Sequence, residues 1–193
     1  KVEQTASFEL YVRKLPPGRS YLVAAGLEQA LQYLENLSFS ADDIDWLRTH
    51  PAFQNIPETF FEMLANFRFE GDVWAIPEGT IFFPYEPILR VTAPIIQAQL
   101  VETWLLSLIN YQTSVASKAA RISAVIQKYD AKVHFTDFGS RRAHGPHAGP
   151  LAARAAYLAG ASGTSNVSAG KTFGIPVQGT AAHSWTMAFP DEK

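Results

Sequence analysis

The last third of the chain combines glycines, arginines and histidines in a stretch that contains no acidic residue. No Asp or Glu occurs over positions 138–190, although Arg141, Arg142 and Arg154 lie there. Eight of the twelve glycines fall between positions 139 and 179. Glycine lets backbone N–H groups approach a ligand closely, and without carboxylates nothing nearby repels an anion. The stretch therefore suits a phosphorylated or carboxylated ligand, although tight packing of small residues would account for the same composition.

The first candidate cluster in this stretch is DFGSRRAHG, residues 137–145. The β-forming residues around its start predict a strand over 133–138, which would run into a glycine and then into Arg141 and Arg142. Ligands of α/β folds bind at the carboxyl ends of parallel strands, and arginine binds a carboxylate or phosphate with two parallel hydrogen bonds. The arginine pair is a candidate anion site, and an ordinary surface loop is the alternative.

Two further clusters follow it. Ser165 and Asn166 stand between a glycine and a helix-sized segment, where they could cap the helix or help to present N–H groups to an anion. His183 lies in a loop of small residues, after a short strand predicted over 175–178. It could be a general base, a metal ligand, a nucleophile toward phosphorus, or a structural group. No HxH or HExxH pattern surrounds it, which weakens the metal interpretation.

Several classes of protein lack their signatures in this sequence. There is no GxGxxG, GxxxxGK[ST] or GxSxG pattern, so no dinucleotide fingerprint, Walker loop or nucleophile elbow is present. The formal net charge of −2 argues against a generally basic nucleic-acid binder. No apolar run reaches the roughly 18 residues of a membrane span. The absence of cysteine excludes a disulfide scaffold and thiolate metal sites and fits a reducing compartment.

The elements that must position these clusters show two patterns. After position 130, short strands alternate with short helices, which predicts parallel βα units. Before it, Ser40 and Asp43 have the spacing of a capping box, and Pro57 suits the first turn of a helix. We predict strands over 8–13, 72–76, 80–83 and 88–92, the middle two as a hairpin-like pair. We predict helices over 22–34, 41–50 and 58–66. Over 95–128 we predict either two helices or one kinked helix, because residues 110–117 are polar and β-branched.

Taken in order, the motifs resemble those of the nicotinate phosphoribosyltransferases. The resemblance rests on DFGSRRAHG (137–145), GTSNVSAG (163–170), FGIPV (173–177) and GTAAHSW (179–185). The first half of the chain agrees through FELYVRKLP (8–16) and FEGDVWAIPEG (69–79). Several ordered motifs at compatible spacing are more specific than any single cluster, and together they extend over nearly the whole chain.

The resemblance implies an α/β fold of the type II phosphoribosyltransferase kind. It places an N-terminal α/β domain over 1–93, a helical connection over 94–130, and the first βα units of an irregular α/β barrel over 131–193. Members of the family are substantially longer than 193 residues. We therefore expect that this chain lacks part of the N-terminal domain and most of the barrel, and that it is inactive alone.

The resemblance also implies a reaction in NAD biosynthesis. Nicotinate and phosphoribosyl pyrophosphate would give nicotinate mononucleotide and pyrophosphate, with Mg²⁺ as cofactor and ATP as co-substrate. It places a phosphorylated histidine at His183 and a nicotinate contact at Thr180. Arg141 and Arg142 would lie near the substrates, and we take Ser165 and Asn166 as further candidate substrate-binding residues.

The same resemblance implies a cytoplasmic enzyme, expected as a homodimer, with no nucleic-acid or membrane partner. Two alternatives remain open. One is a sister phosphoribosyltransferase that takes nicotinamide or quinolinate. The other is a non-catalytic anion-binding module of the same fold.

Overall fold

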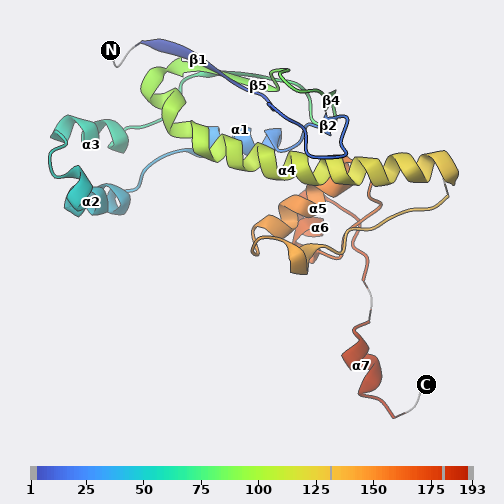
Figure 1. Cartoon of the computed structure of the whole chain (residues 1–193). Coiled ribbons are helices and arrows are strands. Elements are labelled where there is room, and N and C mark those ends of the chain that lie inside the picture. Colours follow the sequence, from blue (N-terminus) through green and yellow to red (C-terminus); the bar gives the residue numbers. More distant parts are fainter. Residues whose placement is uncertain (1–3, 131, 180, 191–193) are drawn as a thin grey trace.

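The computed structural model describes residues 4–130, 132–179 and 181–190, and it has the expected α/β character (Figure 1). The strands are β1 (Thr5–Leu10), β2 (Leu22–Val23), β3 (Asp72–Ala75), β4 (Ile81–Phe82) and β5 (Leu89–Pro94). The helices are α1 (Leu27–Asn36), α2 (Ala41–Thr49), α3 (Glu58–Ala65), α4 (Ile95–Tyr129), α5 (Ala148–Leu158), α6 (Val167–Phe173) and α7 (His183–Met187). Short 3-10 turns occur at η1 (Pro51–Phe53) and η2 (Ser140–Arg142).

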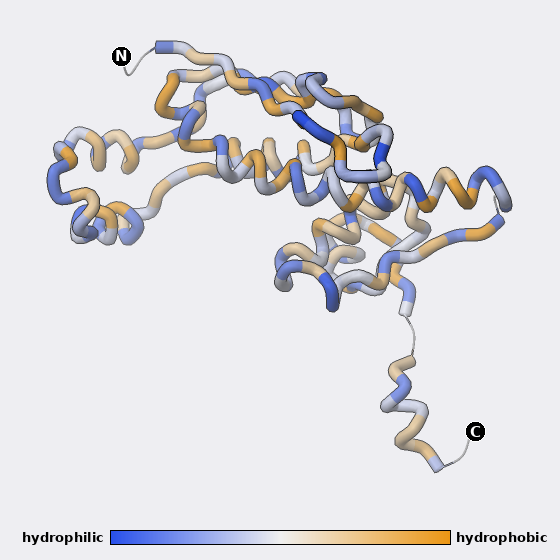
Figure 2. The backbone as a smooth tube through the Cα atoms, viewed as in Figure 1, coloured by the Kyte–Doolittle hydropathy of each residue, from blue (hydrophilic) through white to orange (hydrophobic). Residues whose placement is uncertain are grey.

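The N-terminal part of the structure (residues 4–130) contains an antiparallel sheet that packs on α4. The strand order is β1–β5–β3, and β2 pairs separately with β4. Along β5, Leu89, Val91 and Ala93 are buried and the residues between them are more exposed, as expected for a sheet with one face in the core. The main core joins these residues to Val101 and Leu105 of α4. Apolar and hydrophilic residues alternate along α4 in Figure 2, consistent with one face of the helix covering the sheet.

The expected hairpin between residues 72–76 and 80–83 is wrong. β3 pairs with β5, whereas β4 pairs with β2. The reason is the turn between them, where Gly79 has a φ of 84° and donates to the carbonyl of Ala24 at 2.8 Å. This turn carries the chain away from β3, and Phe82 then becomes almost completely buried in the core.

The predicted helix over 22–34 begins later than expected, because Leu22 and Val23 form β2 and Gly26 has a φ of 103°. The capping box at Ser40 and Asp43 is confirmed at the start of α2. The segment 95–128, predicted as two helices or one kinked helix, belongs to a single helix of 35 residues, α4.

The polar residues that suggested a break in α4 face the N-terminal part. Ser117 Oγ accepts a hydrogen bond from the backbone N–H of Val23 at 2.8 Å. Thr113 Oγ1 accepts from the N–H of Ala25 and donates to its carbonyl. These side chains satisfy backbone groups of residues 23–25, at the end of β2 and directly after it, so the polar residues inside α4 form a tertiary contact.

The C-terminal part of the structure (the described residues from 132 onward) contains three parallel extended segments, which are connected by helices. Thr164 forms parallel bridges with Asp137 on one side and with Val177 on the other. The strands expected over 133–138 and 175–178 are thus represented by single bridges. α5 lies between the first and second segments in the chain and α6 between the second and third, which is the predicted parallel βα order.

Two further observations concern the helices. α5 packs against α4 through alanines, whereas α7 has no buried residue and lies apart from the other elements in Figure 1. Among the described residues, no helix is both long enough and apolar enough to cross a membrane.

Candidate functional site

Asp137 organises the loops that follow the first two parallel segments. Its Oδ2 accepts a hydrogen bond from Thr164 Oγ1 at 2.9 Å, and its Oδ1 accepts from the backbone N–H of Gly139 at 3.0 Å. Thr164 is completely buried, and its Oγ1 also accepts from the N–H of Asn166 at 3.0 Å. The carboxylate therefore fixes the turn that leads into η2 and joins it to the neighbouring loop.

Asn166 connects the same two loops through its side chain. Its Oδ1 accepts from the N–H of Ala169 at 2.8 Å and caps α6, as the sequence suggested. Its Nδ2 donates to Ser140 Oγ at 3.0 Å. Asn166 and the neighbouring Ser165 are partly exposed. The structure thus brings Asn166 and the η2 turn together, with the amide of Asn166 engaged in loop-to-loop contact.

Arg141 and Arg142 lie in η2, and both are exposed. Neither forms an ion pair with a carboxylate of the described residues, where the salt bridges involve Arg48 and Arg154. Two guanidinium groups are therefore presented beside the Asp137–Asn166 network with their donors available to an anion.

The structure does not bring His183 to this cluster. His183 is the first residue of α7, and it is exposed, as are the other described residues of the segment 181–190. Thr180, the other residue expected from the GTAAHSW motif, lies outside the described residues. Arg141, Arg142 and Asn166 are gathered, whereas His183 stands apart from them.

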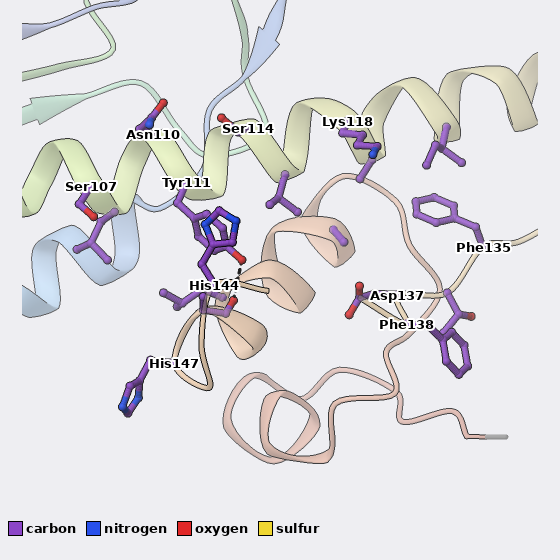
Figure 3. A pocket seen from close by; sticks show the side chains of 18 of the residues that line it. Ser107, Asn110, Tyr111, Ser114, Lys118, Phe135, Asp137, Phe138, His144 and His147 are labelled. Carbon is purple, nitrogen blue, oxygen red and sulfur yellow. Dashed lines mark hydrogen bonds between the residues drawn. The ribbon is translucent and has the colours of Figure 1, made fainter. Parts of the chain in front are cut away.

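A cavity of about 970 Å³ lies between α4 and the segment 135–148. Figure 3 shows Tyr111 and Lys118 of α4 on one side, with Asp137 and His144 of the segment facing the same space. Tyr111 donates its hydroxyl proton to the carbonyl of Ala148 at 3.1 Å, and its ring centre lies 6.4 Å from that of His144. Burial raises the pKa of the Tyr111 hydroxyl, and the negative charge of Asp137 raises it further.

The sequence did not indicate that α4 would contribute the polar side chains of Tyr111 and Lys118 to this cavity. Residues at spacings of three and four place Tyr111 among the apolar positions of the segment 95–128, and this periodicity carries no information about where its hydroxyl points. No sequence pattern near Lys118 indicates that it would line this cavity, because α4 and the segment 135–148 meet only in the folded structure. Asp137 was visible as the last acid before the acid-free stretch, but only the tertiary structure shows that both of its oxygens are hydrogen-bonded.

The described residues do not provide a set of ligands for the Mg²⁺ that the resemblance implies. No group of three or more His, Asp or Glu side chains that could hold a metal ion occurs in residues 4–130, 132–179 and 181–190. The two oxygens of Asp137 are already bonded to Thr164 and Gly139. Magnesium often binds through one or two carboxylates together with substrate phosphates, so a dedicated protein cage is not required for it.

Comparison with known proteins covers the whole chain. The sequence pattern of the nicotinate phosphoribosyltransferase N-terminal domain matches residues 1–110, and that of the nicotinate phosphoribosyltransferase family matches residues 133–191. The chain is 49% identical to nicotinate phosphoribosyltransferase pncB2 of Mycobacterium tuberculosis over 192 residues, covering 100% of the chain and 40% of that protein. It is 47% identical to nicotinate phosphoribosyltransferase of Bacillus subtilis, covering 98% of the chain and 37% of that protein.

Solved structures give the same result for the fold. Human nicotinic acid phosphoribosyltransferase superposes with a TM-score of 0.88 at 36% identity, covering 97% of this chain and 37% of the human one. Nicotinate-nucleotide pyrophosphorylase from Pyrococcus furiosus superposes with a TM-score of 0.75 at 24% identity, covering 98% of this chain and 39% of that one, which shows a shared fold.

The chain spans about 40% of the length of the curated relatives it matches. Both family patterns match it in the order and positions expected from the motifs, and the first alone covers more than half of its residues. The described elements, with parallel βα units after a helix-and-sheet domain, agree with the superposed folds. The chain belongs to the nicotinate phosphoribosyltransferase family.

Proposed function

We propose that the protein containing this chain transfers the phosphoribosyl group of phosphoribosyl pyrophosphate to nicotinate, giving nicotinate mononucleotide and pyrophosphate. One observation carries the proposal. In a chain that belongs to this family, Arg141 and Arg142, which form no ion pair within the described residues, follow the first of three parallel segments, where α/β folds bind ligands. Every substrate and product of the reaction is an anion, so the charge of this region suits all of them.

The chemistry needs positioning and charge stabilisation. The lone pair of the nicotinate ring nitrogen forms a bond to C1 of the ribose, and the bond from C1 to the pyrophosphate oxygen breaks. Pyrophosphate leaves with the bonding electrons, so negative charge grows on it in the transition state. Arg141 and Arg142 would stabilise such charge, and the Asp137–Asn166 network would hold their turn in place.

We propose a separate role for His183 in coupling ATP hydrolysis to this transfer. A ring nitrogen of the histidine would attack the terminal phosphorus of ATP, and the bond from that phosphorus to the bridging oxygen of ADP would break. The exposure of His183 at the start of α7 supports access to a nucleotide. When bound with the polyphosphates, Mg²⁺ would neutralise part of their charge. We also propose a homodimer and a cytoplasmic location.

A substrate panel on the full-length protein tests the reaction. We expect nicotinate mononucleotide from nicotinate, and much lower kcat/KM with nicotinamide or quinolinate. A preference for nicotinamide or quinolinate would favour the sister activity, and absence of any product would favour a non-catalytic anion-binding module.

A second assay tests the coupling to ATP and the activity of the short chain. His183→Ala should remove the stimulation by ATP, and we expect the 193-residue chain alone to show no turnover. If the variant keeps full ATP stimulation, the role of His183 is wrong. If the short chain turns over, the parts essential for activity lie within it.

A further inference from the structure

Arg154 of α5 forms a two-pronged ion pair with Glu78, a residue of the turn before β4. Arg154 Nη1 donates to Glu78 Oε1 at 2.9 Å, and Nη2 donates to Oε2 at 2.7 Å. The same Nη2 donates to Glu28 of α1 at 2.5 Å. The side chains of Arg154 and Glu78 are only 12% and 15% exposed, so this pair is much less screened by water than an ordinary surface salt bridge.

Glu78 also caps α1. Its Oε1 accepts from the backbone N–H groups of Gly26 and Leu27, at 2.5 and 3.1 Å. The residue at the N-cap position is Gly26, which has no side chain to do this. On the other side of the pair, the guanidinium of Arg154 lies 5.8 Å from the ring centre of Phe173 in α6. The Glu78–Arg154 pair therefore joins the N-terminal part to two helices of the C-terminal part.

Elsewhere the side chains between α4 and α5 are largely small, and two hydrogen bonds from α4 reach backbone carbonyls at the two ends of α5, from Tyr111 to Ala148 and from Ser123 to Ala159. α5 meets α4 and the β2 segment through Ala155 and Ala156, which pack with Ala116, Ala119 and Ala25. Alanines allow two helices to approach closely but interdigitate little, so they define the position of one helix along the other poorly. A paired guanidinium and carboxylate has strict geometry, and it supplies the orientation that these alanines do not.

The position of α5 governs the position of the candidate site. α5 begins at Ala148, where its carbonyl accepts from Tyr111, directly after the loop that contains η2. Gly149 lies so close to Asn166 that an added Cβ would be 3.2 Å from Asn166 Nδ2. A shift of α5 would therefore displace the Ser140–Asn166 contact and, with it, the turn that carries the two arginines.

We propose that Glu78 and Arg154 are positioning residues for phosphoribosyl transfer, which hold α5 so that Arg141 and Arg142 face the anionic substrates. This inference rests on the proposed function. Glu78 and Arg154 do not touch the substrates in this account, and they act through α5 and η2.

The test compares Arg154→Met and Arg154→Lys in the full-length protein. Arg154→Met should raise the KM for phosphoribosyl pyrophosphate about tenfold and lower kcat as well, because displacement of Arg141 and Arg142 weakens both the binding of the anion and the stabilisation of charge in the transition state. Arg154→Lys keeps the positive charge but cannot form the two parallel hydrogen bonds to Glu78, so its KM should lie between those of the wild type and Arg154→Met. Amide hydrogen exchange over 139–150 should accelerate in Arg154→Met.

Two matched controls separate positioning from stability. Arg48→Met removes an exposed arginine that is paired with Asp45 and Glu58 in the N-terminal part, and it should leave KM unchanged. Leu64→Ala removes a buried side chain of α3 from the core cluster that it shares with Ile44 and Phe61, a cluster that contains no residue of α1 or α5. It should therefore lower Tm without changing the orientation of α5.

The outcomes distinguish the two proposals. If the wild-type protein forms no nicotinate mononucleotide, the proposed function fails, and the exchange experiment still reports on the pair. If the wild type is active but Arg154→Met and Leu64→Ala show the same KM and the same exchange over 139–150 at an equal loss of Tm, the pair is structural and the positioning role is wrong.

Discussion

Asn166 shows how one side chain can support the geometry of the whole candidate site. Its oxygen caps α6 and its nitrogen bonds to Ser140 of η2, so the second loop and the arginine-bearing turn share a residue. With Asp137 and Thr164, it forms a network of side-chain hydrogen bonds within two adjacent loops. Such a network holds loop residues in one arrangement, which a site for charged substrates requires.

Replacing Asn166 should separate its two functions. Asn166→Ala removes both hydrogen bonds and should lower the free energy of unfolding by about 1–2 kcal/mol, with most of the loss from the helix cap. Asn166→Asp retains an acceptor for Ala169 but not the donor to Ser140, so it should be milder. Thermal denaturation of both variants measures this. Equal losses in the two would show that the cap contributes nothing.

At this scale the sequence predicted residue types better than residue partners. Ser40 with Asp43 and Asn166 before α6 were both expected as caps, because capping depends on neighbours in the chain. The bond from Asn166 to Ser140 spans 26 residues, and the bidentate contact of Glu78 with Arg154 spans 76. No local pattern encodes such distances, so these contacts could only come from the fold.

Among the elements, α1 has a close approach to α4 that depends on one glycine. Gly26 has a φ of 103°, and a Cβ there would lie 3.0 Å from the carbonyl oxygen of Leu108 and 3.1 Å from Gln112 Nε2. Any other residue at position 26 would therefore destabilise the fold in two ways, through the left-handed backbone conformation and through crowding of its Cβ against α4.

Gly26→Ala should lower the free energy of unfolding by more than about 2 kcal/mol, as measured in urea. Gly18→Ala is the matched control, since Gly18 also has a positive φ of 70° but has nothing within 4 Å of the added Cβ. It should cost about 1 kcal/mol, because only the backbone penalty applies. Equal losses would mean that α1 and α4 can separate to accommodate a methyl group.

The Glu78–Arg154 pair joins elements and should be visible in the pH dependence of stability. Burial by itself raises the pKa of the Glu78 carboxyl, but the hydrogen bonds from Arg154, Gly26 and Leu27 outweigh it, so its pKa lies below the usual 4.5. Its contribution is therefore fully present above the unfolded pKa and is lost as the pH falls through the folded pKa. Glu28, the other carboxylate on Arg154, stays in place in this test.

Glu78→Gln should cost about 1–3 kcal/mol at pH 7. The difference in unfolding free energy between wild type and variant should stay constant down to about pH 5.5 and shrink as the pH falls through 4.5 and below. Urea titrations from pH 3 to pH 7 measure it. A difference that grows at low pH would contradict the assigned direction of the pKa shift.

The elements that the sequence predicted well are those with a strong local signal. α2, α3 and the start of α4 follow a capping residue or a proline. The sequence failed where pairing partners are distant: residues 72–76 and 80–83 look like a hairpin, yet each pairs with another strand. It also did not show that the polar residues Thr113 and Ser117 of α4 are buried against residues 23–25, where they leave the helix unbroken.

At the scale of the whole molecule, the described elements form two groups. One group consists of the antiparallel sheet, α1 and α4, which share a core. The second group consists of the three parallel segments together with α5 and α6. The family and the fold class could be predicted from the order and spacing of the motifs, because the motifs can be recognised without knowledge of the contacts between distant residues. The positions of Tyr111 and Lys118 beside the acid-free segment required the assembled structure.

The central claim is that Arg141 and Arg142 bind the anionic substrates of phosphoribosyl transfer to nicotinate. The most direct test is the kcat/KM for nicotinate mononucleotide formation by the full-length protein and its Arg141→Met/Arg142→Met variant, with Arg48→Met as control. We expect an active wild type, an unchanged control and a fall of about 100-fold or more in the double variant. An inactive wild type, or a double variant with wild-type kcat/KM, would contradict the claim.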